Sequence, residues 1–363
     1  MPSPPPDRWP QDHGGNVWEA VDASRVVDFS ASINPFGPPP GLWDEVVAVW
    51  PLIVHYPDRS CRRLIEALAR RLGSPARALA VGNGSAELID LVLRCLAPER
   101  VLVCPPDFGL YTGLVPPGVA VHRVPRAEAR SFGLDLQGLE QAVRAGDLVV
   151  FSNPSNPAGT LLPAERVLAL ADLCRERGAR LVVDEAFIDF VPDQSVAGQA
   201  PFREELVVLR SLTKFYALPG LRIGFLVAAP SVAERIRSRQ VPWSVNTLAQ
   251  AAGAFCLAQE GWETRARSAL EVQRRRFSAA LERLPGVRPL PSAANYLLVE
   301  LCRPAPEAGR VYRALADQGI LVRHCGSFGL GDRFVRVAVR RPEENDRLVA
   351  ALGSLLPARM AAP

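Results

Sequence analysis

The chain has 363 residues, of which 48% are hydrophobic and 22% charged, a composition typical of a globular protein with one large and one smaller domain. The net charge of +4 comes from scattered arginines rather than a basic block, so we expect no nucleic-acid partner. No stretch approaches the roughly 20 apolar residues of a membrane span, and the Pro-rich start lacks the apolar centre of a secretory signal, which predicts a cytoplasmic protein without a membrane partner.

The cysteines and histidines suggest neither a disulfide framework nor a metal site. The seven cysteines are an odd number without a C-x-x-C pair, and most stand in apolar runs, which favours buried free thiols in a reducing compartment. The four histidines show no ligand spacing, so we expect no metal.

The first elements after the Pro-rich start are short. V-V-D-F-S at residues 26–30 predicts a strand, residues 34–40 a loop and residues 45–50 a short helix. The apolar spacing of residues 62–72 fits one face of a helix, which Gly73 can close.

From residue 78 onward, strands and helices alternate. The expected strands cover residues 78–81, 101–104, 119–124, 148–152, 181–184, 206–211 and 223–229. The expected helices are one that G-N-G-S-A-E opens and that runs to about Leu96, one at 136–143 and one at 163–178. This alternation predicts a mostly parallel α/β sheet covered by helices.

The regular alternation of strands and helices ends in the last third of the chain. Residues 246–284 are expected to be helical and charged on one face. Strands at 296–301, 320–323 and 334–339 then stand between helices at 309–318 and 342–356. We interpret this part as a separate α+β domain.

Lys214 is the single lysine of the chain, and the other 41 of its 42 basic residues are arginines. Surface charge does not need lysine, since arginine serves there equally well. Covalent imine chemistry does need it, because a guanidinium stays protonated and cannot act as the nucleophile. Chance survival in an Arg-rich composition is the alternative, and the neighbouring residues weigh against it.

Polar groups follow several predicted strands at their carboxyl ends, where doubly wound sheets bind ligands. Gly84 and Ser85 stand at an expected helix N-terminus, which attracts anions. Asp184 ends an apolar strand and is either functional or a helix cap. Hydroxyls and a guanidinium, which are phosphate ligands by type, flank the lysine at Ser211, Thr213 and Arg222.

An amine, an acid and a phosphate cradle together describe a site for pyridoxal 5'-phosphate. The aldehyde of this cofactor needs a lysine, its pyridine nitrogen needs an acid that keeps it protonated, and its phosphate needs an anion-binding cradle. The residues around Lys214 therefore predict this cofactor.

The motifs resemble those of the fold-type-I aminotransferase superfamily over nearly the whole chain. They are S-x-T-K-x7-R at Lys214, Asp184 thirty residues before the lysine, and N-P-S-N-P-A-G about as far upstream again. H-G-G-N, S-I-N-P-F-G, Y-P-D, D-E-A-F-I-D-F and P-W-S-V-N look most like the threonine-phosphate decarboxylase family of cobalamin biosynthesis, whose nearest relatives are histidinol-phosphate aminotransferases.

The resemblance implies an α/β fold of the fold-type-I, pyridoxal-phosphate-dependent transferase class. Its large domain would hold a mostly parallel sheet sandwiched by helices, beside a smaller α+β domain. We expect residues 1–44 to form an N-terminal arm and part of the small domain, residues 45–260 the large domain and residues 261–363 the rest of the small domain. A homodimer is also implied, in which Tyr56 reaches the partner's cofactor.

The resemblance also assigns roles around the cofactor. Lys214 would bond the aldehyde, and Asp184 would pair with the pyridinium. Asn156 would hydrogen-bond the ring hydroxyl, and Phe108 would stack on the ring. The expected phosphate ligands are Gly84, Ser85, Ser211, Thr213, Arg222 and, from the partner, Tyr56.

The substrate residues implied by the resemblance lie near both ends of the chain. Arg336 matches the arginine that binds the substrate carboxylate, and Arg323 matches the one that contacts a substrate phosphate. Asn156, His13 and Asn34 would complete the pocket. The alternative for each arginine is a solvated surface charge, and for Arg340 the two readings are equally good.

The activity implied is decarboxylation of O-phospho-L-threonine to (R)-1-amino-2-propanol O-2-phosphate, on a phosphorylated amino-acid substrate. Transamination of histidinol phosphate or a related amino acid is the alternative. Phe187 stands where the aminotransferases usually have tyrosine, which favours the decarboxylase without settling the choice. A cofactor-binding module without catalysis is a third hypothesis, and the intact lysine, acid and arginines argue against it.

Overall fold

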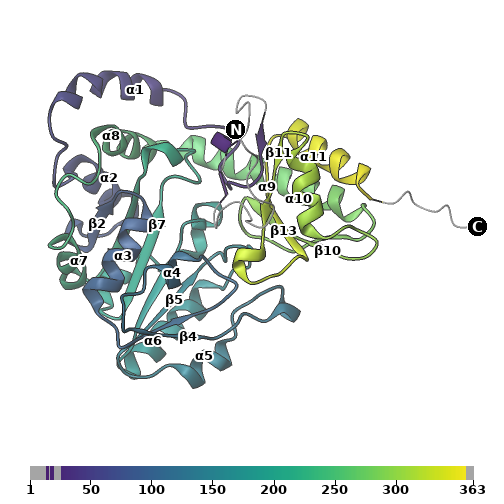
Figure 1. The fold of residues 1–363 in the computed structure, drawn as a ribbon. Coiled ribbons are helices and arrows are strands. Elements are labelled where there is room, and N and C mark those ends of the chain that lie inside the picture. Colours follow the sequence, from purple (N-terminus) through teal and green to yellow (C-terminus); the bar gives the residue numbers. More distant parts are fainter. Residues whose placement is uncertain (1–13, 16, 20–25, 357–363) are drawn as a thin grey trace, which may run out of the picture. The chain divides into compact units, whose positions relative to one another are not determined.

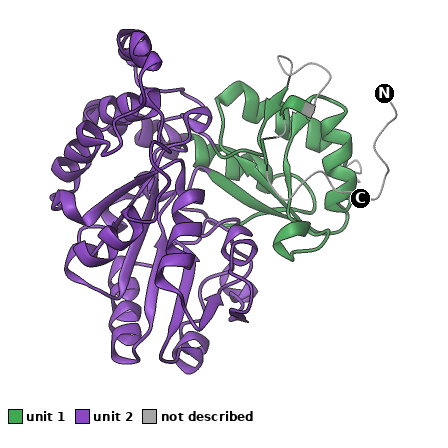
Figure 2. Ribbon diagram, turned by 60° about the vertical axis from the view of Figure 1, so that its left-hand side comes forward, with its two compact units in different colours: residues 1–32, 273–290, 296–363 green, residues 33–272, 291–295 purple. Residues whose placement is uncertain are grey.

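The computed structural model describes residues 14–15, 17–19 and 26–356. They form two compact units, coloured in Figure 2, of which unit 1 comprises residues 1–32, 273–290 and 296–363, and unit 2 comprises residues 33–272 and 291–295. These borders fall at residues 32 and 272, whereas the sequence-based boundaries are at residues 44 and 260. The division into functional domains stays a prediction.

Unit 2 is built on a seven-stranded sheet of order β2-β8-β7-β6-β5-β3-β4 within the described residues (Figure 1). Its strands are β2 Leu79–Gly82, β3 Arg100–Val103, β4 Ala120–Arg123, β5 Asp147–Ser152, β6 Arg180–Asp184, β7 Leu206–Ser211 and β8 Gly224–Ala228. Strands β4, β3, β5, β6 and β7 run parallel, while β8 is antiparallel to both β7 and β2. The expected, mostly parallel α/β sheet is confirmed.

Both faces of this sheet are buried. Along β6, Leu181 and Val183 enter one hydrophobic cluster, while Val182 between them enters a second cluster on the other face. Because successive strand residues point to opposite faces, a sheet covered on both sides needs an unbroken apolar run. This explains why the strands read as runs of valine and leucine rather than as alternating patterns.

Helices on the two sides of the sheet supply the rest of these clusters. Helices α2, α6 and α8 contribute side chains to the first cluster, and α3 and α7 contribute to the second. No helix of the described chain is both long enough and apolar enough to cross a bilayer. The helices that begin in unit 2 are α1 Leu42–Val49, α2 Arg62–Leu72, α3 Ser85–Leu96, α4 Leu110–Gly113, α5 Leu136–Ala142, α6 Ala164–Glu176, α7 Pro230–Arg237, α8 Thr247–Cys256 and α9 Glu260–Glu282.

The helical stretch expected over residues 246–284 is two helices, α8 and α9, with a break at residues 257–259. Asn246 caps α8 by accepting a hydrogen bond from the Ala249 N–H. The second helix begins with Glu260 and Glu263 in its first turn, where acidic groups stabilise the helix dipole. The break was not visible in the apolar pattern because both helices keep a helical period.

Unit 1 contains a four-stranded antiparallel sheet of order β12-β13-β10-β9 in its described residues. Val27 and Asp28 of β1 pair in parallel with Ile320 and Leu321 of β11, so the chain's N-terminal part joins the C-terminal unit. The elements are β1 Val27–Asp28, β9 Val287–Pro289, β10 Tyr296–Leu301, α10 Ala308–Ala316, β11 Ile320–Leu321, β12 Arg323–His324, β13 Phe334–Ala338 and α11 Pro342–Ser354.

Candidate active site

Three parallel strands of unit 2 end in polar residues at one edge of the sheet. Ser152 ends β5, Asp184 ends β6 and Ser211 ends β7. Ser152 and Asp184 are direct register partners. Because parallel strands present their carboxyl ends at the same edge, this edge is where an α/β sheet binds its ligand.

Asp184 is a buried carboxylate with two hydrogen-bond donors. The Tyr111 hydroxyl donates to its Oδ2 at 2.7 Å, and the Ala186 N–H donates to its Oδ1 at 3.0 Å. Burial raises the pKa of Asp184 from 3.8 to about 6, against the lowering effects of these hydrogen bonds and of the Lys214 charge. A buried anion of this kind favours a cationic partner, which is what the pyridinium of the predicted cofactor would supply.

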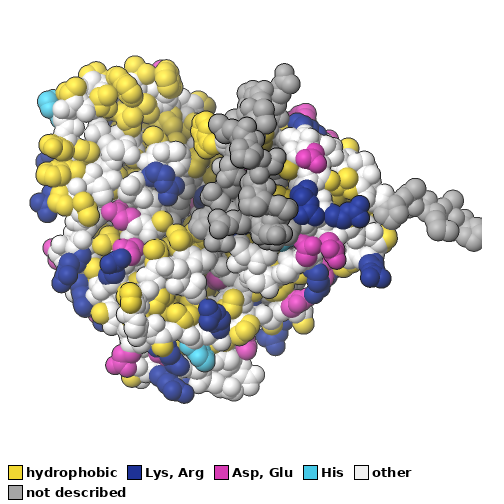
Figure 3. Space-filling model, viewed as in Figure 1, with side chains coloured by type: hydrophobic (Ala, Val, Ile, Leu, Met, Phe, Trp, Pro, Cys, Tyr) yellow, Lys and Arg dark blue, Asp and Glu magenta, His cyan; other side chains and the backbone are white. Residues whose placement is uncertain are grey.

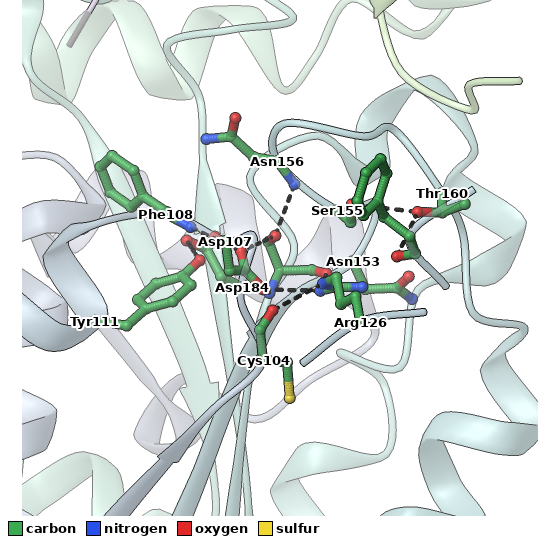
Figure 4. Close-up of polar contacts among 12 residues, drawn as sticks. Cys104, Asp107, Phe108, Tyr111, Arg126, Asn153, Ser155, Asn156, Thr160 and Asp184 are labelled. Atoms are coloured by element: carbon green, nitrogen blue, oxygen red, sulfur yellow. Dashed lines mark hydrogen bonds and ion pairs between the residues drawn. The ribbon is translucent and has the colours of Figure 1, made fainter. Parts of the chain in front are cut away.

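Phe108 and Asn156 lie near this carboxylate in Figure 4, each held through its backbone. The Phe108 N–H donates to Asp107 Oδ1 at 2.9 Å, and the Asn156 N–H donates to Ser152 Oγ at 2.8 Å. The Phe108 ring meets Tyr111 edge-on, with centroids 5.7 Å apart. The structure thus brings together the residues predicted to stack on the ring and to bond its hydroxyl, and their roles stay predictions.

The predicted phosphate ligands form a cradle around the start of α3. Ser211 Oγ and Thr213 Oγ1 are 2.8 Å apart, and Ser211 is the register partner of Gly224. A Cβ added to Gly224 would lie 2.7 Å from the Ser85 backbone nitrogen, so the strand and the helix start approach closely. Hydroxyls beside free N–H groups at the N-terminus of a 12-residue helix suit an anion.

Arg222 and Gly84 close the other side of the cradle. A Cβ added to Gly84 would lie 2.5 Å from an Arg222 guanidinium nitrogen, so a larger residue there would displace the guanidinium. Gly84 has φ +78° and Arg222 has φ +58°, both in the left-handed region. A guanidinium, two hydroxyls and a helix start fit the phosphate of pyridoxal phosphate.

The backbone around Lys214 is held by Asn34. The Asn34 N–H donates to the Lys214 carbonyl at 3.0 Å, and its side-chain amide donates to the Phe215 carbonyl at 2.9 Å. The Asn34 Oδ1 in turn accepts from the Phe36 N–H at 3.1 Å. Asn34 therefore braces the lysine segment, which its sequence did not indicate, and its predicted contact with substrate stays a prediction.

Tyr56 lies on the surface of unit 2 and is 79% exposed. Its ring stacks on Trp243, with centroids 4.7 Å apart. The side chain is thus placed by an aromatic neighbour while most of its surface stays open. This placement suits the predicted reach toward a partner subunit.

Arg323 and Arg336 lie side by side in unit 1 as register partners on β12 and β13. Both are only 6% exposed. Arg336 donates to the Ser30 carbonyl at 2.7 Å, and Arg323 donates to Ser327 Oγ at 2.5 Å. Burial lowers the pKa of Arg336, since the charged guanidinium is removed from water. Two buried like charges on adjacent strands are stabilised by a bound anion.

Three other sequence predictions have different outcomes. His13 lies outside the described residues, so its predicted role is not addressed. Arg340 donates to the Asp28 carbonyl at 3.0 Å and pairs with Glu344 at 2.8 Å, which favours a structural role over the solvated charge. Phe187 is buried.

Sequence reasoning missed four residues of this site: Tyr111, Asp107, Arg126 and Ser152. Tyr111 follows Phe108 by three residues, a spacing that places both on one side of a helical turn and could have pointed to it. No comparable signal joins Asp107 to Arg126 or Ser152, because their contacts depend on how the strands are ordered in the sheet.

A family model for class I and II aminotransferases matches residues 25–352, so the chain belongs to this family. Its cofactor is pyridoxal 5'-phosphate, and its fold is that of the fold-type-I aminotransferases. The structure of histidinol-phosphate aminotransferase from Sinorhizobium meliloti in complex with pyridoxal-5'-phosphate is similar with a TM-score of 0.79 and 27% identity, covering 90% of this chain and 89% of that chain.

Two curated relatives resemble the chain over nearly its full length. The threonine-phosphate decarboxylase of Salmonella typhimurium is 38% identical over 355 residues, covering 95% of this chain and 96% of the relative. A histidinol-phosphate aminotransferase of Desulfitobacterium hafniense is 32% identical over 348 residues, covering 94% of each. The two activities that the sequence motifs suggested thus both occur among its relatives.

The raised pKa of Asp184 predicts a pH dependence of folding in the cofactor-free protein. Asp184 binds its proton more tightly when folded, so its contribution to the free energy of unfolding is fully present below about pH 4 and is lost as the pH rises to about 6. The loss is at most about 3 kcal/mol, because one pKa unit corresponds to about 1.4 kcal/mol. Urea unfolding of the wild type and of Asp184→Asn between pH 4 and 7 measures it.

The free energy of unfolding of the wild type minus that of Asp184→Asn is expected to fall over this range and to level off above it. With pyridoxal phosphate bound, the fall should disappear, since the pyridinium stabilises the ionised carboxylate. A difference that rises with pH in the cofactor-free protein would contradict the raised pKa.

Proposed function

We propose that the protein decarboxylates O-phospho-L-threonine to (R)-1-amino-2-propanol O-2-phosphate, a step of cobalamin biosynthesis. The buried arginine pair of β12 and β13 carries this proposal. Arg336 and Arg323 supply two separate anion-binding groups, and phosphothreonine carries two separate anions, a carboxylate and a phosphate. The 38% identity to the threonine-phosphate decarboxylase of Salmonella typhimurium supports the same substrate.

In this proposal each residue has a defined task. Lys214 would hold the cofactor aldehyde through its amine, and Asp184 would keep the pyridine nitrogen protonated. The protonated cofactor supplies an electron sink for the bond at Cα that stands perpendicular to its ring. Arg336 would bind the carboxylate through a bidentate fork, and Arg323 would bind the phosphate.

The orientation of the carboxylate decides the reaction. If the arginines hold the carboxylate as the group to be lost, the Cα–carboxylate bond would break, CO2 would leave without the electron pair, and Cα would take a proton from Lys214 or another donor. If they hold the carboxylate in the other orientation, Lys214 would remove the Cα proton instead, which leads to transamination. The two outcomes differ by rotation about one bond.

Transamination of histidinol phosphate is the second candidate. It is favoured by the 32% identity to the Desulfitobacterium hafniense aminotransferase. Histidinol phosphate has a phosphate but no carboxylate. In that reaction Arg336 would therefore bind a carboxylate only when the amino-group acceptor, 2-oxoglutarate, is in the site. Phe187, which has no hydroxyl to bond the cofactor's ring oxygen, weighs toward the decarboxylase.

Incubation of the purified protein with phosphothreonine and pyridoxal phosphate is expected to release CO2 and form one equivalent of the amine phosphate. Arg323→Met should lower kcat/KM by about 10–100-fold, because a hydrogen bond to a charged group contributes about 1.5–3 kcal/mol. Arg310→Met, which changes an exposed arginine of α10, is the matched control and should leave kcat/KM unchanged. Faster turnover of histidinol phosphate with 2-oxoglutarate would overturn the proposal in favour of the second candidate.

We also propose that two copies of the chain form a dimer through the segment around α1. Figure 3 shows hydrophobic side chains gathered where α1 lies. Exposed apolar clusters of this kind mark interaction surfaces. Tyr56 borders the same segment, as its proposed reach into a partner's site requires. The exposed residues of the segment, each at least 48% exposed, are Trp43, Val47, Trp50, Leu52, Ile53 and Val54.

Sedimentation equilibrium at micromolar concentration is expected to give twice the 39.4 kDa mass of the chain. Val54→Glu should shift the protein toward the monomer, because it would bury a charge at the interface. Val272→Glu, at another exposed valine, should leave the mass unchanged. A wild-type mass of one chain would exclude the dimer.

A further inference from the structure

Asp107 links two segments of the candidate site, the loop after β3 that carries Phe108 and the end of β5 that leads to Asn156. It lies in the loop after β3, immediately before Phe108, and its side chain is only 4% exposed. Its carboxylate accepts hydrogen bonds from the Phe108 N–H at 2.9 Å, from the Ser152 N–H at 3.1 Å and from the Ser152 hydroxyl. One buried carboxylate thus joins the loop after β3 to the end of β5.

These hydrogen bonds connect Asp107 to Phe108 and Asn156, the two residues predicted to contact the cofactor ring (Figure 4). On one side, Asp107 holds the backbone of Phe108 directly. On the other side, the Ser152 hydroxyl that donates to Asp107 also accepts the Asn156 N–H at 2.8 Å. Asp107 is therefore one hydrogen bond from Phe108 and two hydrogen bonds from Asn156.

Arg126 provides the counter-charge to Asp107. Its guanidinium lies 2.7 Å from Asp107 Oδ2, and its side chain is only 2% exposed. It also donates to the Cys104 carbonyl at 3.1 Å and to the Ser152 carbonyl at 3.0 Å. Because the pair is buried, removal of either partner leaves an uncompensated charge.

We propose that Asp107 is a positioning residue of the cofactor pocket, which fixes Phe108 and Asn156 relative to each other through Ser152, with Arg126 as its counter-charge. The inference rests on the proposed cofactor contacts of Phe108 and Asn156. Groups that orient direct ligands matter because small displacements of the ligands weaken binding, by about 10–100-fold at metal sites. The charge of Asp107 also acts on Asp184, whose pKa it raises in addition to the effect of burial.

The alternative is that Asp107 stabilises the fold without affecting cofactor binding. The chain offers a control, because a second carboxylate–arginine pair, with a buried carboxylate and an arginine side chain 19% exposed, joins the opposite ends of β3 and β5. There Arg100 and Asp147 are register partners, with a guanidinium–carboxylate distance of 2.7 Å and an Asp147 side chain only 3% exposed. Asp147→Asn disrupts a comparable pair far from the carboxyl ends of the strands.

The test measures cofactor affinity and folding stability separately. Cofactor-free protein is titrated with pyridoxal phosphate, followed by visible absorbance, and unfolded with urea, for Asp107→Asn, Asp147→Asn and the wild type. We expect Asp107→Asn to raise the cofactor Kd by roughly tenfold or more. Asp147→Asn should leave the Kd within about twofold of the wild type, although both variants lower the urea midpoint.

The pH titration of the bound cofactor's visible spectrum provides a second readout. Asp107→Asn removes a negative charge and leaves the positive charge of Arg126 without its partner. Each change lowers the pKa of protonated groups nearby, so the spectral transition should move to lower pH. Asp147→Asn should titrate as the wild type does. This transition reports the electrostatic effect of the Asp107 charge on the bound cofactor, whereas the Kd reports the positioning.

Ser152→Ala keeps the test decisive if Asp107→Asn does not fold. It removes the hydroxyl between Asp107 and Asn156 but leaves the buried ion pair in place, and we expect it to raise the cofactor Kd severalfold. An unchanged Kd in whichever of these two variants folds, or an equal rise in Asp147→Asn, overturns the proposal. These measurements use no substrate, so a wild type that binds pyridoxal phosphate yet turns over neither candidate would refute the proposed function alone.

Discussion

The site depends on the energetic cost of burying the Asp184 carboxylate. The sheet places this group at the end of β6, between β5 and β7, where water cannot solvate it. Donors from Tyr111 and Ala186 offset only part of the cost, since the pKa remains raised to about 6. A pyridinium beside Asp184 would add a positive charge and lower this cost further, which is why this position suits the predicted cofactor.

The same principle applies with opposite sign in unit 1. Arg323 and Arg336 are buried on adjacent strands, and the free energy cost of burying two positive charges falls when an anion binds. Ser30 and Ser327 hold the guanidinium groups in place without neutralising them. In the proposed function a ligand would complement each of these buried charges, a cofactor cation at Asp184 and a substrate anion at the two arginines.

Much of the site could be predicted from sequence because its residues stand in short motifs. Lys214, with hydroxyls before it and Arg222 after it, is recognisable from local spacing alone. Two contacts could not be predicted from the sequence, because they join residues distant in the chain. They are the pairing of Asp107 with Arg126 and the hydrogen bonds by which Asn34 holds the lysine segment. The antiparallel direction of β8 likewise depends on how the chain returns to the sheet, which no local pattern records.

Borohydride reduction of the protein with pyridoxal phosphate, followed by mass spectrometry of its peptides, tests the central claim most directly. Lys214 carries the only lysine amine of the chain, so one peptide alone should gain a reduced cofactor. Lys214→Arg keeps the positive charge and should bind pyridoxal phosphate without forming the adduct or turning over substrate. A Lys214→Arg protein that turns over normally, or a wild type labelled elsewhere, would contradict the account.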